Sequence, residues 1–286
     1  MTVTQPPSTG PSYKKITITR VTPTIGADVT GVSLAKIDDQ TFDEIHDAFL
    51  RFKVLFFRDQ HDFLPSHHQQ LAGRFGEIDP PPKALATHAD AAGVGIIETD
   101  EENKPYVDYW HTDLAYKKRP AMVSILRACL VPEVGGDTLW ADMEAAYDEL
   151  SGDMKDRLAG LRTYNSYAKL VDFGPVPQSV IEQRLKEWPP VEHPIVRTHP
   201  ETGRKSIYVA VNTATHVVGV DPAESEALLE FLYRLSDKPE YQCRIRWTPD
   251  TVAMWDNRST RHYATADYWP QRRVMERAIV TGEVPE

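Results

Sequence analysis

Alternating hydrophobic and polar positions predict several β-strands along the chain. Successive side chains of a strand point to opposite faces, so a period of two indicates a strand with one buried face. Short uninterrupted apolar runs are typical of strands that are buried on both faces. These patterns predict strands over residues 16–21, 54–57, 122–131, 195–198, 206–211, 243–247, 252–255 and 274–280.

Helices are predicted between these strands by apolar residues at helical spacing and by polar residues that cap a helix start. Asp221, followed by Pro222 and Glu224, is a strong start signal. Ser66 and Gln69 form a capping box for a helix that runs to residue 75. Two further helices are expected over residues 143–158 and after residue 38, where one apolar face comprises Phe42, Ile45, Phe49 and Phe52.

The order of these elements favours a mainly β fold with flanking helices. Strands outnumber helices, and the helices occur singly between groups of strands, unlike the alternation of a doubly wound parallel sheet. The sequence has no G-x-G-x-x-G motif and no Walker loop, and Gly135–Gly136 predicts a turn that enters a strand. We expect a single domain over residues 14–286, preceded by a disordered tail over residues 1–13 that is rich in Pro, Ser and Thr.

Composition excludes several classes of protein. The 286 residues carry a net charge of −10 with no basic stripe, so nucleic acid is not an expected partner. No apolar run approaches the roughly 20 residues of a membrane helix, and the first residues lack the pattern of a secretory signal. Two cysteines, Cys129 and Cys243, are too few for a disulfide framework. A cytoplasmic protein is therefore expected.

The first candidate for chemistry is the segment Trp110-His111-Thr112-Asp113. On an extended strand His111 and Asp113 point to the same side and could offer a nitrogen and an oxygen to one metal ion. His262, close to the end of the chain, could complete a set of two histidines and one carboxylate, which suits an Fe(II) that activates oxygen. The alternatives are a hydrogen-bonded surface His–Asp pair, because H-x-D is common by chance, and a loop histidine at position 262.

The second candidate is the arginine-rich segment at the chain end. Arg273, Met275 and Arg277 share one face of the strand predicted there. Two arginines on one face repel unless anions lie beside them, and an organic-acid cofactor and an anionic substrate would supply two such anions. The alternative is that both arginines pair with Asp or Glu of a neighbouring strand.

Taken together, these motifs resemble the taurine dioxygenase family of Fe(II)/2-oxoglutarate-dependent oxygenases. Members of that family act on taurine, alkyl sulfate esters and phenoxyacetate herbicides. The resemblance extends over nearly the whole chain and is carried by residues 25–32, 54–60, 74–76, 110–113, 135–140, 193–200, 255–263 and 271–277.

The resemblance implies a fold and a set of roles. The fold is a double-stranded β-helix, a cupin-like jelly roll. His111, Asp113 and His262 match the iron ligands, and catalysis would use Fe(II), O2 and 2-oxoglutarate as cosubstrate. Thr138 and Arg273 match the residues that hold the far carboxylate of 2-oxoglutarate, and Trp255 matches an aromatic that packs near it. Relatives of this kind are commonly homodimers or homotetramers.

The same resemblance implies a small anionic substrate held by Arg277. Three further positions are expected at the substrate. Val107 stands where taurine-using enzymes have an asparagine, Thr213 lies near the place of a substrate-stacking aromatic, and Leu114 follows the metal carboxylate. A proline also replaces a histidine within residues 80–82. These departures disfavour taurine and favour a sulfonate, alkyl sulfate or carboxylate with a more apolar body, whose hydroxylation would release sulfite, sulfate or an aldehyde.

Two other functions fit the same residues less completely. A zinc metallohydrolase could use the two histidines and the aspartate to bind Zn(II) and a hydroxide, but it leaves Thr138 and Arg273 without a role. A non-catalytic jelly-roll binding protein could keep the fold without the metal, but the intact set of ligands argues against it.

Overall fold

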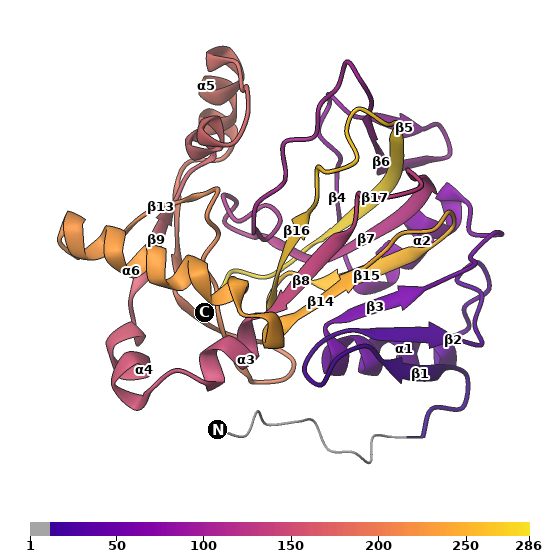
Figure 1. Cartoon of the computed structure of the whole chain (residues 1–286), viewed down its shortest axis with the longest axis horizontal. Helices are drawn as coiled ribbons and strands as arrows, with labels where there is room; N and C mark the ends of the chain where they lie inside the picture. Colours follow the sequence, from indigo (N-terminus) through magenta and orange to yellow (C-terminus); the bar gives the residue numbers. More distant parts are fainter. Residues whose placement is uncertain (1–11) are drawn as a thin grey trace.

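A large antiparallel sheet forms one wall of the molecule (Figure 1). The computed structural model describes residues 12–286; of the predicted tail, residues 1–11 lie outside this range, while Tyr13 donates a hydrogen bond to Asp47 at 2.6 Å. Among the strands of residues 12–286, only β2 and β3 pair in parallel. The strand order is β1 (Thr17–Arg20), β2 (Ala27–Thr30), β3 (Val54–Phe57), β15 (Val252–Asp256), β7 (Ala121–Leu130), β17 (Arg273–Thr281), β6 (Ala91–Thr99) and β5 (Ala86–His88), with β4 (Ile78–Asp79) also paired to β17.

A smaller sheet faces the inner side of this wall. It comprises β14 (Gln242–Ile245), β8 (Thr138–Asp142) and β16 (Thr260–Ala264). Buried side chains of the two sheets meet in one apolar layer, in which the ring of Trp140 on β8 lies 5.6 Å from that of Trp255 on β15. The sheets face each other without closing into a barrel. This arrangement agrees with the predicted jelly roll with flanking helices.

Two helices cover the outer face of the large sheet (Figure 1). They are α1 (Asp39–Phe52) and α2 (Pro65–Phe75). Both present apolar side chains, such as Phe49 and Leu71, to a buried cluster that includes Ile125 and Met254 of the sheet. The outer face of the large sheet is therefore covered by packed helices, which leaves the space between the sheets for a site.

The rest of the chain packs beside the smaller sheet. A third sheet contains β10 (Val191–Pro194), β9 (Arg162–Asn165) and β13 (Ala214–Val217), and β11 (Val196–Thr198) pairs with β12 (Lys205–Ile207). The helices of this part are α3 (Met143–Asp148), α4 (Gly152–Leu158), α5 (Gln178–Glu187) and α6 (Pro222–Arg234), with 3-10 turns at Tyr167–Asp172, Leu235–Asp237 and Pro239–Tyr241.

Two predictions about helices were wrong. The helix expected over residues 143–158 is two helices, because the Ser151 side chain accepts the Met154 N–H and starts α4 afresh. The helix expected from a Ser66–Gln69 box instead starts at Pro65, where the Leu64 N–H donates to His67 Nδ1 at 3.1 Å. Gln69 instead accepts a hydrogen bond from the Gly93 backbone.

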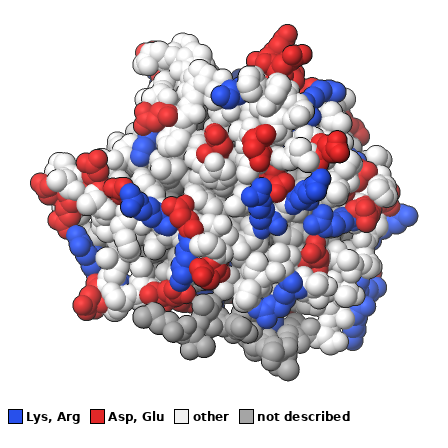
Figure 2. All heavy atoms as spheres, viewed as in Figure 1, with Lys and Arg blue, Asp and Glu red and all other residues white. Residues whose placement is uncertain are grey.

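The charged residues are scattered over the visible surface. Figure 2 shows acidic and basic side chains interspersed on this face of the molecule. Among the helices of residues 12–286, none combines the length and the apolar character that crossing a membrane requires.

A buried charge network holds the turn between β15 and β16. Asp256 accepts hydrogen bonds from Arg258 Nε at 2.8 Å and Nη2 at 2.7 Å, and one from His199 Nε2 at 3.0 Å. His199 Nδ1 accepts two backbone N–H bonds, so its proton is on Nε2. Burial alone would raise the pKa of Asp256, but the charge and hydrogen bonds of Arg258 hold that pKa far below its ordinary value.

Removing this carboxylate is expected to destabilise the fold strongly. Asp256→Ala leaves the buried Arg258 with Glu201 alone, so the free energy of unfolding should fall by about 3–5 kcal/mol in urea denaturation. Glu226→Ala removes an exposed carboxylate and should change it by less than about 0.5 kcal/mol. Equal effects of the two substitutions would contradict a structural role for the network.

Candidate metal centre and active site

A backbone bridge joins the two histidines of the predicted metal set. The His111 N–H donates to the His262 carbonyl at 2.9 Å, and the His262 N–H donates to the His111 carbonyl at 2.7 Å. Their ring centroids lie 4.0 Å apart. His262 belongs to β16, so the segment that carries His111 extends the smaller sheet by one residue pair. Residues from distant parts of the sequence thus become neighbours.

Asp113 is placed by two polar residues that the motifs did not single out. Ser124 on β7 donates to Asp113 Oδ2 at 2.6 Å, and Asn257 Oδ1 accepts the Asp113 backbone N–H at 3.1 Å. Asn257 Nδ2 in turn donates to Ser124 Oγ at 2.9 Å. Leu114 follows with a positive φ of 57°, an uncommon conformation for a leucine. The large sheet therefore orients the Asp113 carboxylate through Ser124 on β7.

His111, Asp113 and His262 converge and are all buried. Their candidate ligand atoms lie within 4.8 Å of one another. His262 Nε2 is 3.9 Å from Asp113 Oδ2, too far for a hydrogen bond. Two imidazoles and one carboxylate that converge without bonding to each other fit a divalent metal ion, and this ligand set is typical of non-haem Fe(II).

The protonation states also fit a metal. Burial lowers the pKa of His111. Burial, together with the nearby His111, lowers the pKa of His262 well below its ordinary value. Burial alone would raise the pKa of Asp113, but the charge of Arg277 and the hydrogen bond from Ser124 contribute to lowering it to about 2. The site thus holds neutral imidazoles and an ionised carboxylate at neutral pH, the forms that bind metals.

The tautomer of His111 is set by its neighbour Tyr109. His111 Nδ1 lies 3.0 Å from the Tyr109 carbonyl, which can only accept, so this nitrogen carries the proton. Nε2 is then free to bind a metal. Metal-binding histidines usually donate their other ring N–H to a carbonyl or carboxylate, as His111 does here. Trp255 packs its ring against that of His262, with the two ring centroids 4.8 Å apart.

Arg273 and Thr138 also face the space between the sheets. Arg273 is 8% exposed, and among residues 12–286 it forms no ion pair; its Nη2 donates a long bond of 3.4 Å to the Gly136 carbonyl, and its Nε is buried without a partner. Thr138 and Trp140 are two residues apart on β8, so their side chains point to the same side of the sheet. On the neighbouring strand they pair with Ala264 and His262. A buried, unpaired guanidinium and a threonine hydroxyl that both face this space suit a carboxylate.

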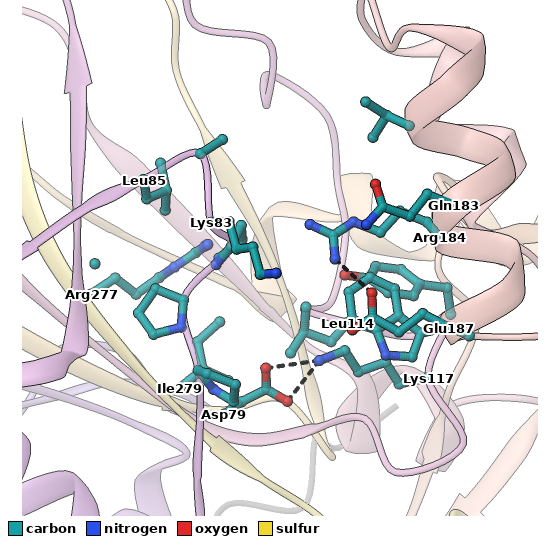
Figure 3. Close-up of a pocket in the computed structure, with 18 residues that line it drawn as sticks. Asp79, Lys83, Leu85, Leu114, Lys117, Gln183, Arg184, Glu187, Arg277 and Ile279 are labelled. Atoms are coloured by element: carbon teal, nitrogen blue, oxygen red, sulfur yellow. Dashed lines mark hydrogen bonds and ion pairs between the residues drawn. The ribbon is translucent and has the colours of Figure 1, made fainter.

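Arg277 connects the metal set to a cavity of about 720 Å³ (Figure 3). Its Nη1 lies 3.4 Å from Asp113 Oδ1, and it lines the cavity together with Leu114. Of the three other basic residues of the cavity, Lys117 pairs with Asp79 at 2.8 Å and Arg184 with Glu187 at 3.0 Å, whereas Lys83 is exposed and no ion pair of residues 12–286 includes it. The remaining lining is largely apolar and includes Pro80, Pro81, Leu85, Val180, Trp188 and Ile279.

Two of the positions expected at the substrate are not part of this cavity. Val107 is 42% exposed, and Thr213 is buried with its hydroxyl donating to Asn165 Oδ1 at 3.0 Å. Neither lines the cavity beside Arg277. Tyr116 and Trp188, which sequence reasoning missed, do line it, with ring centroids 5.2 Å apart. The position of Tyr116, shortly after the metal carboxylate, was the only signal for its role.

The fold and the donor set together define a metal-dependent jelly-roll enzyme. Comparison with known proteins makes this class specific, because the family model described as "Taurine catabolism dioxygenase TauD, TfdA family" matches residues 17–279. That range is most of the chain, so the chain belongs to this family of dioxygenases, as the motifs predicted.

Individual relatives agree with this assignment. The chain is 35% identical to an alkylsulfatase of Acinetobacter baylyi, covering 95% of this chain and 86% of that protein. It is 33% identical to an (S)-phenoxypropionate/alpha-ketoglutarate-dioxygenase of Sphingobium herbicidovorans, with 91% and 93% covered. The solved structure of AAD-2 with Mn(II) and N-oxalylglycine superposes with a TM-score of 0.84 at 27% identity, covering 95% and 99%. The predicted fold and the enzyme class, a 2-oxoglutarate-dependent dioxygenase, are confirmed.

Loss of the Ser124 hydroxyl is expected to weaken metal binding. Ser124→Ala removes the bond that orients Asp113, so the affinity for Mn(II) or Fe(II) should fall about 10- to 100-fold in competition with a chelator. Ser151→Ala removes a helix cap and should lower stability by about 1 kcal/mol without changing metal affinity. An unchanged affinity in Ser124→Ala would show that Asp113 needs no such support.

Proposed function

We propose that this protein is an Fe(II)- and 2-oxoglutarate-dependent dioxygenase that hydroxylates a small organic anion. The candidate substrates are sulfonates, alkyl sulfates and aryl or alkyl carboxylates. Support comes from the names of the relatives, which include an alkylsulfatase and a phenoxypropionate dioxygenase. Support also comes from Arg277, a cation that lines a mostly apolar cavity and contacts the metal-binding carboxylate.

The single observation that carries the proposal is the state of Arg273. A buried guanidinium is costly unless an anion compensates it, and burial lowers the pKa of Arg273. No carboxylate of residues 12–286 pairs with it, and the hydroxyl of Thr138 is buried on β8 of the facing sheet. The far carboxylate of 2-oxoglutarate would supply the missing charge. A zinc hydrolase has no use for such a group.

The residues of the chain divide the work of the reaction. His111, Asp113 and His262 would hold the metal, which together with 2-oxoglutarate and O2 supplies the oxidising chemistry when bound. Arg277 would bind the acidic head of the substrate and so place a neighbouring C–H near the metal. Where the hydroxylated carbon also bears a sulfonate, sulfate or ether oxygen, the product breaks down to a carbonyl compound and the released acid.

The cavity favours an anion with an apolar body over taurine. Its lining beside Arg277 is provided mainly by apolar and aromatic side chains, among them Leu85, Trp188 and Ile279. Three successive prolines, residues 80–82, occupy the stretch where taurine-using enzymes place a histidine. A volume of about 720 Å³ lies in the range of pockets that bind molecules larger than taurine.

Loss of the Arg273 guanidinium should impair use of 2-oxoglutarate. In Arg273→Ala the far carboxylate loses its charged partner, so KM for 2-oxoglutarate in succinate release should rise about 10- to 100-fold. The control is Arg272→Ala, since Arg272 immediately precedes β17, is exposed and pairs with Glu98. An unchanged KM in Arg273→Ala would contradict the assignment, and turnover without O2 would favour a hydrolase.

Loss of the Arg277 charge should impair use of the substrate. A succinate-release screen with taurine, longer alkanesulfonates, alkyl sulfates and phenoxyacetates should give the lowest rates with taurine. For the best substrate, Arg277→Gln should lower kcat/KM about 10- to 100-fold while 2-oxoglutarate binding is kept. Arg184→Gln, in the same cavity but already paired with Glu187, should have a much smaller effect. Equal losses in both variants would contradict a specific role for Arg277.

A further inference from the structure

Thr138 and Arg273, the two groups that would face the far carboxylate of 2-oxoglutarate, are each in contact with a buried aromatic side chain. Trp247 and Tyr268 are 4% and 2% exposed. The Trp247 Nε1–H donates to Thr138 Oγ1 at 3.0 Å, and the Arg273 guanidinium carbon lies 5.6 Å from the centroid of the Tyr268 ring. Neither aromatic belongs to the metal set or to the cavity beside Arg277.

The indole determines which way the Thr138 hydroxyl can act. An indole N–H can only donate, so Thr138 Oγ1 accepts this bond and its own proton must point elsewhere. Among residues 12–286 no acceptor takes that proton. A carboxylate can only accept hydrogen bonds. Trp247 therefore makes Thr138 a committed donor before any carboxylate arrives.

Tyr268 limits the positions of the Arg273 guanidinium. The Tyr268 hydroxyl and Thr99 Oγ1 share a hydrogen bond of 2.7 Å, which anchors the ring at its far end. On the other side the ring lies against Gly136, where an added Cβ would come within 3.1 Å of Tyr268 Cδ1. Asp267 fastens the same contact, because its Oδ1 accepts the Gly136 N–H at 2.8 Å.

We propose that Trp247 and Tyr268 are positioning residues that hold Thr138 and Arg273 ready for a carboxylate, and thereby select keto-diacids over keto-monoacids. The inference rests on the proposed use of 2-oxoglutarate. Donors that are oriented in advance lose little freedom when the ligand binds, so the orientation contributes directly to affinity. Only a keto-diacid has a second carboxylate that can reach Thr138 and Arg273, so this gain in affinity favours keto-diacids over keto-monoacids.

The test measures binding without turnover. The Mn(II)-loaded protein is titrated calorimetrically with 2-oxoglutarate and with 2-oxobutyrate, which has the same keto-acid head but lacks the far carboxylate. Trp247→Phe keeps an aromatic ring and loses the N–H, so affinity for 2-oxoglutarate should fall about three- to tenfold. Affinity for 2-oxobutyrate should change less than about twofold, because this ligand does not reach Thr138.

Tyr268 is tested by two substitutions. Tyr268→Leu removes the ring beside Arg273 and should reduce the preference for 2-oxoglutarate by a similar factor of about three to ten. Tyr268→Phe keeps the ring and loses only the bond to Thr99, so it should retain more of that preference and serves if the leucine variant fails to fold. The control is Trp269→Phe, which removes an indole bond to the Asp100 carbonyl and should leave both affinities unchanged.

The outcomes separate this inference from the proposed function. If the unaltered protein shows no preference for 2-oxoglutarate over 2-oxobutyrate, the proposed cosubstrate is wrong. If the unaltered protein has the preference but the Trp247 and Tyr268 variants keep it in full, the positioning role is wrong. Equal weakening of both ligands in these variants would indicate general damage to the fold or metal centre, and would also overturn the positioning role.

Discussion

The metal centre depends on the pairing of His111 with His262. Two backbone hydrogen bonds of 2.9 and 2.7 Å bring a loop and a strand from distant parts of the chain into register. Each bond contributes only about 1 kcal/mol to stability. That is sufficient because the packing of the two sheets already brings these segments together and offsets the entropic cost of closing the intervening chain. The register of β16 on β8 then decides which side chains lie beside the two imidazoles.

Two buried arginines near the metal centre differ in their partners. Arg258 is neutralised by Asp256 and Glu201, and it stabilises the turn between β15 and β16. Arg273 is almost as deeply buried, yet no carboxylate of the described residues neutralises it. An uncompensated buried charge reduces stability, so its place in the fold is best explained by a ligand that supplies the anion. Arg258 thus stabilises the fold, whereas Arg273 would bind a ligand.

Arg277 lies where the metal centre meets the cavity. It contacts Asp113 on one side and faces a mostly apolar space on the other (Figure 3). The sheets determine the position of this arginine, while the walls of the cavity come from α5 and from the loop over residues 79–85. Such peripheral segments vary more freely than a sheet core. In the proposed function, metal chemistry and substrate choice would thus be carried by different parts of the fold.

The sequence by itself determined several of the strands, because period-two alternation is a local property. Its motifs, by their resemblance to a known family, determined the family and the likeness of His111, Asp113, His262, Arg273 and Arg277 to known site residues. Only the tertiary structure decided that Ser124 and Asn257 support Asp113 and that Thr213 bonds to Asn165 away from the cavity. These outcomes depend on which polar groups meet after the sheets pack, and hydrogen-bond partners across sheets are not encoded in the spacing of residues along one strand.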